Sequence, residues 1–160
     1  MATNFNDSLP VAPAGRTNAA WQTDGSGNVS VNIPTSPIEL PNNVDLTAQA
    51  ANISGTNLLT GGVATAGMYA VYVYIIITQA ASSSSTMPSV VLTWTDKDNG
   101  QAQTITATAT SGGNLLTTYA QTRVTMSIAN STNIQYSTTG YVSSGGTPMQ
   151  YALHLRLVQL

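Results

Sequence analysis

Apolar and polar positions alternate along most of the chain from Val44 onward. In the run from Val44 to Ala50 every second residue is apolar, which is the period of side chains along a β-strand. Further segments rich in Val, Ile, Thr and Tyr are separated by turn residues and are predicted as strands: Gly67–Gln79, Ser89–Thr95, Gln101–Thr110, Gln121–Ala129, Asn133–Tyr141 and Met149–Leu160. No segment shows a helical period with caps. The sequence therefore predicts one all-β domain over residues 42–160, a jelly-roll-type antiparallel β-sandwich.

One of these predicted strands, over residues 68–78, is apolar on both faces. One face carries Tyr69, Val71, Val73, Ile75 and Ile77, and the other carries Ala70, Tyr72, Tyr74 and Ile76. A strand that is apolar on both sides has to be covered on both sides, either by the N-terminal segment or by another subunit. Tyrosine is frequent at interfaces because its ring buries area while its hydroxyl keeps a hydrogen bond. Tyr72, Tyr74 and Ile76 are therefore candidate residues of a subunit interface.

Residues 1–41 have a different composition, rich in Pro, Asn, Gly and Ala, and five prolines fall among them. Proline lacks an amide donor, which excludes a long helix or a central strand here, and only residues 29–33 alternate like a short strand. The segment is either a flexible leader or an extended N-terminal arm that becomes ordered on a neighbouring subunit or on a larger lattice. The candidate docking residues of such an arm are its isolated apolar side chains: Phe5, Leu9, Val11, Trp21, Ile38 and Leu40.

Charged residues are scarce, at 6% of the chain against about 25% in a typical soluble protein. The four basic residues, Arg16, Lys97, Arg123 and Arg156, are too scattered to form the basic stripe that nucleic acid or a membrane surface requires. The chain has no cysteine, which excludes disulfides and thiolate metal sites. Composition therefore argues against nucleic acid and against a membrane as partners.

Candidate chemistry is sparse, and we expect no catalytic residue, cofactor site or metal site. His154 is the sole histidine, and no acidic residue lies within ten positions of it, so it is interpreted as an exposed or interface side chain. The run Asp96–Gly100 resembles a calcium loop, but its glycine falls one position early and Ala107 stands where the loop needs Glu. A hairpin turn with positive φ at Asn99 and Gly100 is the better interpretation, with a weak cation site as the alternative. The chain is not expected to be an enzyme.

Several segments carry a resemblance to known proteins. Gly67–Tyr74 resembles the Gly-x-Tyr strand of trimeric jelly rolls of the tumour-necrosis-factor-like type, and residues 149–157 resemble their closing core strand. The hydroxyl-rich strands, residues 134–141 and the final strand also resemble small structural proteins of tailed bacteriophages. The resemblance covers roughly residues 44–160.

This resemblance implies a homotrimeric virion protein on the capsid surface, a head decoration (cement) protein that binds the major capsid protein. The alternative is a receptor- or carbohydrate-binding knob of a phage fibre or tail. Exposed aromatic residues such as Trp21, Trp94 and Tyr141 would favour the alternative if they lined a groove, because sugars stack on aromatic rings.

Overall fold

A computed structural model of the chain describes residues 20–23, 29–32, 43–108 and 111–160. The chain divides into two compact units, Met1–Ser36 and Pro37–Leu160. In the first unit β1 (Ala20–Thr23) and β2 (Val29–Asn32) form an antiparallel hairpin, which confirms the short strand expected at residues 29–33 and gives it a partner. The other candidate docking residues of the arm lie outside the described residues: Phe5, Leu9, Val11, Ile38 and Leu40.

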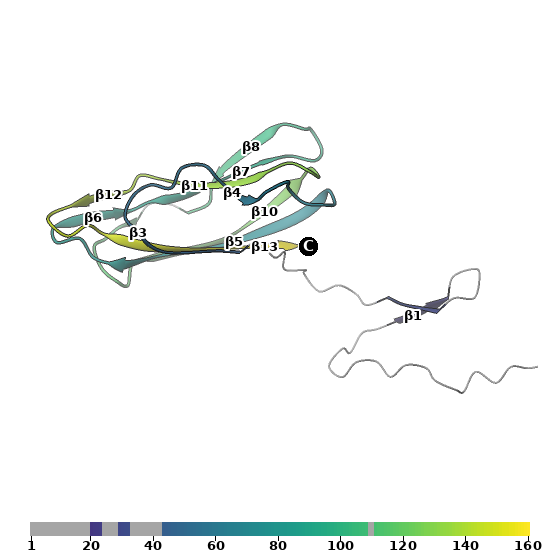
Figure 1. Cartoon of the computed structure of the whole chain (residues 1–160), viewed down its shortest axis with the longest axis horizontal. Helices are drawn as coiled ribbons and strands as arrows, with labels where there is room; N and C mark the ends of the chain where they lie inside the picture. The colour runs from purple at the N-terminus through teal and green to yellow at the C-terminus, as the bar shows by residue number, and fades with distance from the viewer. Residues whose placement is uncertain (1–19, 24–28, 33–42, 109–110) are drawn as a thin grey trace, which may run out of the picture. The chain divides into compact units, whose positions relative to one another are not determined.

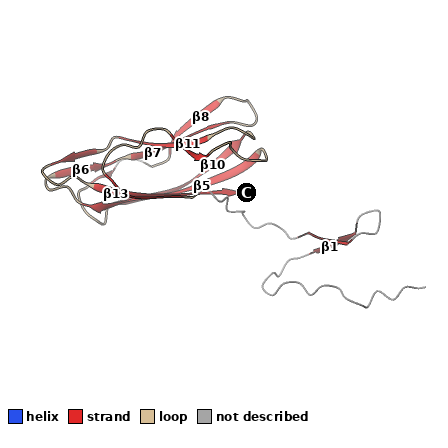
Figure 2. Cartoon of the chain, in the orientation of Figure 1, coloured by secondary structure: helices blue, strands red, loops and turns tan. Residues whose placement is uncertain are grey.

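The second unit is a sandwich of antiparallel strands, and the described residues contain no helix (Figure 2). One sheet has the strand order β10-β5-β13-β3, the other has the order β4-β11-β7-β8, and a small sheet of β12, β6 and β9 lies at one end (Figure 1). The predicted all-β, jelly-roll-type antiparallel sandwich is confirmed. The strands are β3 (Val44–Gln49), β4 (Thr56–Leu59), β5 (Gly67–Gln79), β6 (Ser84–Met87), β7 (Ser89–Thr95), β8 (Ala102–Thr106), β9 (Ser111–Gly112), β10 (Tyr119–Ile128), β11 (Ile134–Thr139), β12 (Val142–Ser144) and β13 (Gln150–Gln159).

The core lies between the two large sheets and is filled by alternate residues of the long strands. β5 and β13 pair in antiparallel register, with Val73 opposite Leu155 and Ile75 opposite Leu153. The odd-numbered residues of both strands point inward and are buried, as their alternation predicts: Tyr69, Val71, Val73, Ile75, Ile77, Tyr151, Leu153, Leu155 and Leu157. Val90 and Leu92 on β7 and Ile134 on β11 meet them from the opposite sheet. Each such aliphatic side chain contributes roughly 1.5–3 kcal/mol on burial.

Four short strands, β4, β6, β9 and β12, are absent from the sequence-based prediction. β6 and β12 pair through serines, and the Ser84 and Ser144 hydroxyl oxygens are 2.7 Å apart. These strands have two to four residues each, which is too short for alternation of apolar residues to reveal them.

The turn between β7 and β8 is the hairpin that the sequence predicts. The backbone N–H of Gly100 donates to the Asp96 carbonyl at 3.0 Å, and the Asp96 side chain accepts from the amides of Asp98 and Asn99 at 2.9 and 3.2 Å. Gly100 has a φ of +68°, whereas Asn99 does not have positive φ, so the expectation is wrong for Asn99. Among the described residues no three His, Asp or Glu side chains gather in a way that could hold a metal ion.

Removal of one buried hydroxyl should test the packing of this core. Tyr151 is fully buried, and its hydroxyl donates to the Ala51 carbonyl at 2.8 Å and lies 3.0 Å from the Thr138 hydroxyl. Burial raises the pKa of Tyr151. Tyr151→Phe removes both contacts, while the Thr138 hydroxyl keeps the hydrogen bond that it accepts from the Ile53 amide at 2.7 Å. We therefore expect a loss of about 0.5–1.5 kcal/mol in the free energy of unfolding, measured with urea. Tyr72→Phe, at an exposed ring of the same sheet, is the matched control, and an equal loss in both variants would contradict this account.

Candidate functional site

The surface of the β10-β5-β13-β3 sheet that points away from the core, called here the outer face, gathers the largest polar and aromatic side chains of the sheet. Even-numbered residues of β5 and β13 and odd-numbered residues of β10 point to this side because side chains alternate along a strand. Two rows cross it from strand to strand: Gln121, Tyr74, His154 and Asp45 form the first, and Arg123, Tyr72 and Arg156 form the second.

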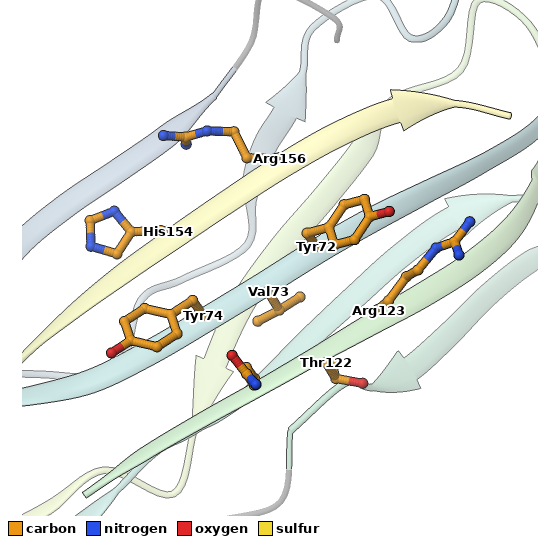
Figure 3. Close-up of a pocket in the computed structure, with 8 residues that line it drawn as sticks. Tyr72, Val73, Tyr74, Thr122, Arg123, His154 and Arg156 are labelled. Carbon is orange, nitrogen blue, oxygen red and sulfur yellow. The ribbon is translucent and has the colours of Figure 1, made fainter. Parts of the chain in front are cut away.

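These rows border an open groove of about 550 Å³, called here the groove (Figure 3). Figure 3 shows Tyr72 on β5 between Arg123 of β10 and Arg156 of β13, with Tyr74 beside His154. The lining residues are Tyr72, Val73, Tyr74, Gln121, Thr122, Arg123, His154 and Arg156. Three strands that are far apart in sequence therefore supply one surface, and the antiparallel register decides which side chains meet on it.

Arg123 is held against an aromatic ring. Its guanidinium carbon lies 5.6 Å from the centre of the Tyr72 ring, within the range of a cation–π contact. The Tyr72 side chain is exposed at 46% of its surface, and Arg123 is also exposed. Within the described part of the chain, the Arg123 guanidinium has no hydrogen-bond or ion-pair partner. The ring therefore orients the guanidinium while its N–H groups face solvent.

Arg156, by contrast, is engaged by its neighbours. Its Nη2 donates to Asp45 Oδ1 at 3.0 Å, and its Nη1 donates to the carbonyls of Leu155 and Val44. Nδ1 of His154 lies 2.7 Å from the same Asp45 oxygen. In the neutral tautomer with the proton on Nδ1, this contact is a hydrogen bond to Asp45 and leaves Nε2 as an acceptor. Sequence reasoning missed Asp45 as the partner of His154 because 109 positions separate the two residues.

The Asp45 contacts make a testable contribution to acid stability. Hydrogen bonds from His154 and then from Arg156 lower the pKa of the Asp45 carboxyl below its ordinary value of 3.8. A lowered pKa in the folded state stabilises the fold above pH 3.8, and this contribution is lost as the pH falls through the folded-state pKa. We expect Asp45→Asn to lower Tm at about pH 6, with the difference from wild type vanishing toward about pH 2. A constant difference across that range would contradict the assignment.

One end of the outer face is apolar. Tyr119 on β10 lies opposite Ile76 on β5, and the loop before β10 carries Leu115 and Leu116. Leu115, Leu116 and Tyr119 are exposed at 66%, 58% and 54% of their surfaces. The loop is fixed to the sheet, since the Ile77 amide donates to the Thr118 carbonyl at 3.0 Å. We call these four residues, Ile76, Leu115, Leu116 and Tyr119, the apolar end.

The three residues predicted for a subunit interface divide between these two surfaces. Tyr72 and Tyr74 line the groove, whereas Ile76 belongs to the apolar end. The Tyr74 ring joins the two regions, because its centre is 6.0 Å from that of Tyr119 and 6.1 Å from that of His154. The surface around the outer side of β5 is therefore polar at the groove, where neighbouring strands supply polar side chains, and apolar at the apolar end.

Two of the aromatic residues that would favour a sugar-binding knob if they lined a groove lie elsewhere. Trp94 packs against the core, and its indole N–H donates to the Ser127 carbonyl at 3.1 Å. Tyr141 also packs against the core, and its hydroxyl donates to the Met149 carbonyl at 2.6 Å. Trp21 lies on β1, and its side chain falls outside the described residues. Tyr72 and Tyr74 of β5 line the groove instead. The sequence signal for them is their even-numbered positions, which place both on the outer face of the strand.

The groove combines hydrogen-bond donors with aromatic rings. Arg123, Gln121 and the tyrosine hydroxyls offer hydrogen-bond donors beside aromatic rings. The neighbouring carboxylate, Asp45, is already engaged by Arg156 and His154.

Across the described ranges, no helix is long and apolar enough to span a membrane.

Comparison with known proteins gives no family. No family model matches the chain, and no curated protein matches it. A solved structure similar to it is that of the CBM22-1 and GH10 modules of the N-terminal endo-1,4-β-D-xylanase 10B of Clostridium thermocellum, complexed with xylohexaose. The TM-score is 0.38 at 10% sequence identity, over 89% of this chain and 25% of that one, so this chain spans about a quarter of that structure. Similarity at this level does not identify a function.

Proposed function

We propose that this protein is a non-enzymatic structural component of a tailed-phage virion that binds the capsid exterior as a decoration (cement) trimer. The observation that carries the proposal is the apolar end of the outer face. It exposes Leu115, Leu116 and Tyr119 beside the longest strand of the sandwich. Exposed apolar side chains that gather at one place mark an interaction surface, and the resemblance to trimeric jelly rolls supports a second copy as the occupant.

A closed ring of three copies would bury the apolar end of each subunit. Ring closure leaves no unmatched apolar surface that could drive fibre growth. Ile76 is half-buried within the single chain and would form the centre of the contact, with Tyr74 at its margin toward the groove. The arm of residues 1–41 would then attach the trimer to the major capsid protein, and three arms acting together would make weak individual contacts tight.

The number of copies in each purified virion tests this proposal. A decoration protein follows the capsid lattice, so we expect hundreds of copies for each particle by quantitative mass spectrometry. A dozen or so copies would place the protein on a fibre or tail and contradict the decoration role.

Attachment to the particle should depend little on salt. The chain has four basic and six acidic residues, too few for docking to rely on exposed ion pairs, which are weak and screened. We expect co-sedimentation with particles to stay nearly unchanged when sodium chloride is raised from about 0.05 M to about 1 M, although the Debye length falls from more than about 10 Å to about 3 Å. Clean release at high salt would show that a charged partner surface supplies the affinity.

A second candidate function is a receptor- or carbohydrate-binding knob of a fibre or tail. The groove favours it, because exposed Tyr72 lies beside the guanidinium of Arg123 and Tyr74 lies opposite Gln121. A hydroxyl-rich ligand such as a sugar can stack on an aromatic ring while its hydroxyls accept hydrogen bonds from amide and guanidinium donors. The groove and the apolar end are different parts of the outer face, so a trimer could also bind a ligand.

A further inference from the structure

We propose that the groove binds a carboxylate-bearing carbohydrate, a polysaccharide of uronic acid residues, and that Arg123 pairs with its carboxylate. The inference rests on the carbohydrate-binding candidate above and names the class of sugar. Among the described residues, the groove gathers two arginines, although the whole chain has a formal net charge of −2.

The first step is the distribution of charge across the groove. Its lining includes two arginines and no acid. Arg156 is neutralised by Asp45, which also accepts the hydrogen bond from His154. Arg123 has no such partner among the described residues. One unpaired guanidinium in an open groove attracts an anion, and it determines where on the ligand the negative charge must lie.

The second step is the geometry of the guanidinium. Its planar fork matches a carboxylate through two parallel N–H···O bonds, which an ammonium group cannot reproduce. The contact with Tyr72 at 5.6 Å holds Arg123 in one orientation before a ligand arrives. Such preorganisation lowers the entropy cost of binding.

The third step is what surrounds the charge. Tyr72 and Tyr74 project from the same side of β5 two residues apart, about 6.6 Å along the strand. Arg123 stands opposite Tyr72, and Gln121 stands opposite Tyr74 on β10. A chain of sugars that runs along β5 would therefore meet an aromatic ring and a polar donor twice in succession.

An acidic peptide fits this surface less well. Extended peptides join a sheet by adding main-chain hydrogen bonds at an edge strand. β5 is paired on both sides, with β10 and with β13, so a ligand over it meets side chains alone. Rings and hydroxyls, which a polysaccharide offers in every residue, suit tyrosine and glutamine side chains.

The test measures binding of the full chain to polygalacturonate and to alginate, two uronic acid polymers, by titration calorimetry. Fully methyl-esterified polygalacturonate keeps the sugar backbone but blocks the carboxylate, and poly-L-glutamate keeps the carboxylate without the sugar. We expect at least one of the two uronic acid polymers to bind, and polygalacturonate to bind at least about tenfold more tightly than its ester. We also expect poly-L-glutamate to bind at least about tenfold more weakly than the uronic acid polymer.

Variants locate the site. Arg123→Gln should weaken binding at least about tenfold, and Arg123→Lys should restore only part of it because the fork is lost. Lys97→Gln removes the same unit of charge in the β7–β8 turn, outside the groove lining, and should leave the affinity unchanged. Both Arg123 variants should unfold in urea as the wild type does, because this exposed side chain fills no part of the core.

Three outcomes would overturn the inference. Equal affinity for polygalacturonate and its ester would show that the carboxylate does not contribute to binding, while the carbohydrate-binding candidate would remain. Equal affinity for poly-L-glutamate would show general charge attraction in place of sugar recognition. Absence of binding to both uronic acid polymers and to the ester would overturn the inference together with the carbohydrate-binding candidate, whereas the trimer is tested separately by its mass.

Discussion

If the protein is the trimer proposed above, a negative charge placed in the apolar end should convert it into monomers of 16.6 kDa. Leu115→Asp and Leu116→Asp change side chains that are exposed in the single chain, so they should not disturb the core. In the trimer the new carboxylate would be buried without a partner, at a cost of several kcal/mol for each subunit. Light scattering at matched concentrations measures the change, and a loss of at least about a hundredfold in association is expected.

Ile76→Asp and Tyr74→Asp should act in the same direction, as monomers or as insoluble protein, because both positions lie on the predicted interface strand. Thr125→Asp is the matched control, since Thr125 lies on the outer face opposite Ala70, away from the apolar end, and should leave the mass unchanged. If all four Asp variants, at positions 74, 76, 115 and 116, remain soluble trimers of wild-type mass, the subunit contact lies elsewhere.

Deletion of residues 2–40 should abolish attachment to the particle while the sandwich still folds and forms trimers. β1 and β2 pair with each other and join neither large sheet, so the sandwich does not need them for its pairing. A two-stranded hairpin is marginally stable by itself, which suits a segment that is completed by a partner. Ordering the arm costs roughly 1–2 kcal/mol for each fixed residue, and its six apolar side chains return about 1.5–3 kcal/mol each.

The arm should therefore be ordered only around its apolar residues, and tight docking should need all three arms of a trimer. Loss of that multivalency weakens binding by about 10²–10⁴-fold, which co-sedimentation detects easily. Trp21→Ala in the full chain should weaken attachment without changing the mass of the trimer. Normal attachment of the truncated protein would show that the sandwich itself contacts the particle and that residues 1–41 are only a leader.

The strands that the sequence predicts best are those rich in β-branched and aromatic residues and bounded by turn residues. β5 and β7 have the predicted bounds, Gly67–Gln79 and Ser89–Thr95, because β-branched and aromatic residues fill both strands. β8 is shorter than predicted and ends at Thr106. Beyond it, the Ala107 amide donates to the Val90 carbonyl outside the regular strand pairing, a change that alternation alone does not show.

The candidate site was predictable only in part, for a related reason. Alternation shows that Tyr72 and Tyr74 share a face of one strand, but it does not show which strands lie beside it. The rows that bring Arg123 next to Tyr72, and Asp45 next to His154, depend on pairing between distant strands. That pairing is fixed by packing of the whole sandwich, so neither the groove nor its charge could be read from local sequence.

The central claim, assembly through the outer face, is tested most directly by the mass of the full wild-type chain in solution. Multi-angle light scattering over a range of protein concentrations should give three times 16.6 kDa at working concentrations. A constant mass of 16.6 kDa across that range would contradict the account, because the apolar end would then be exposed in a stable monomer.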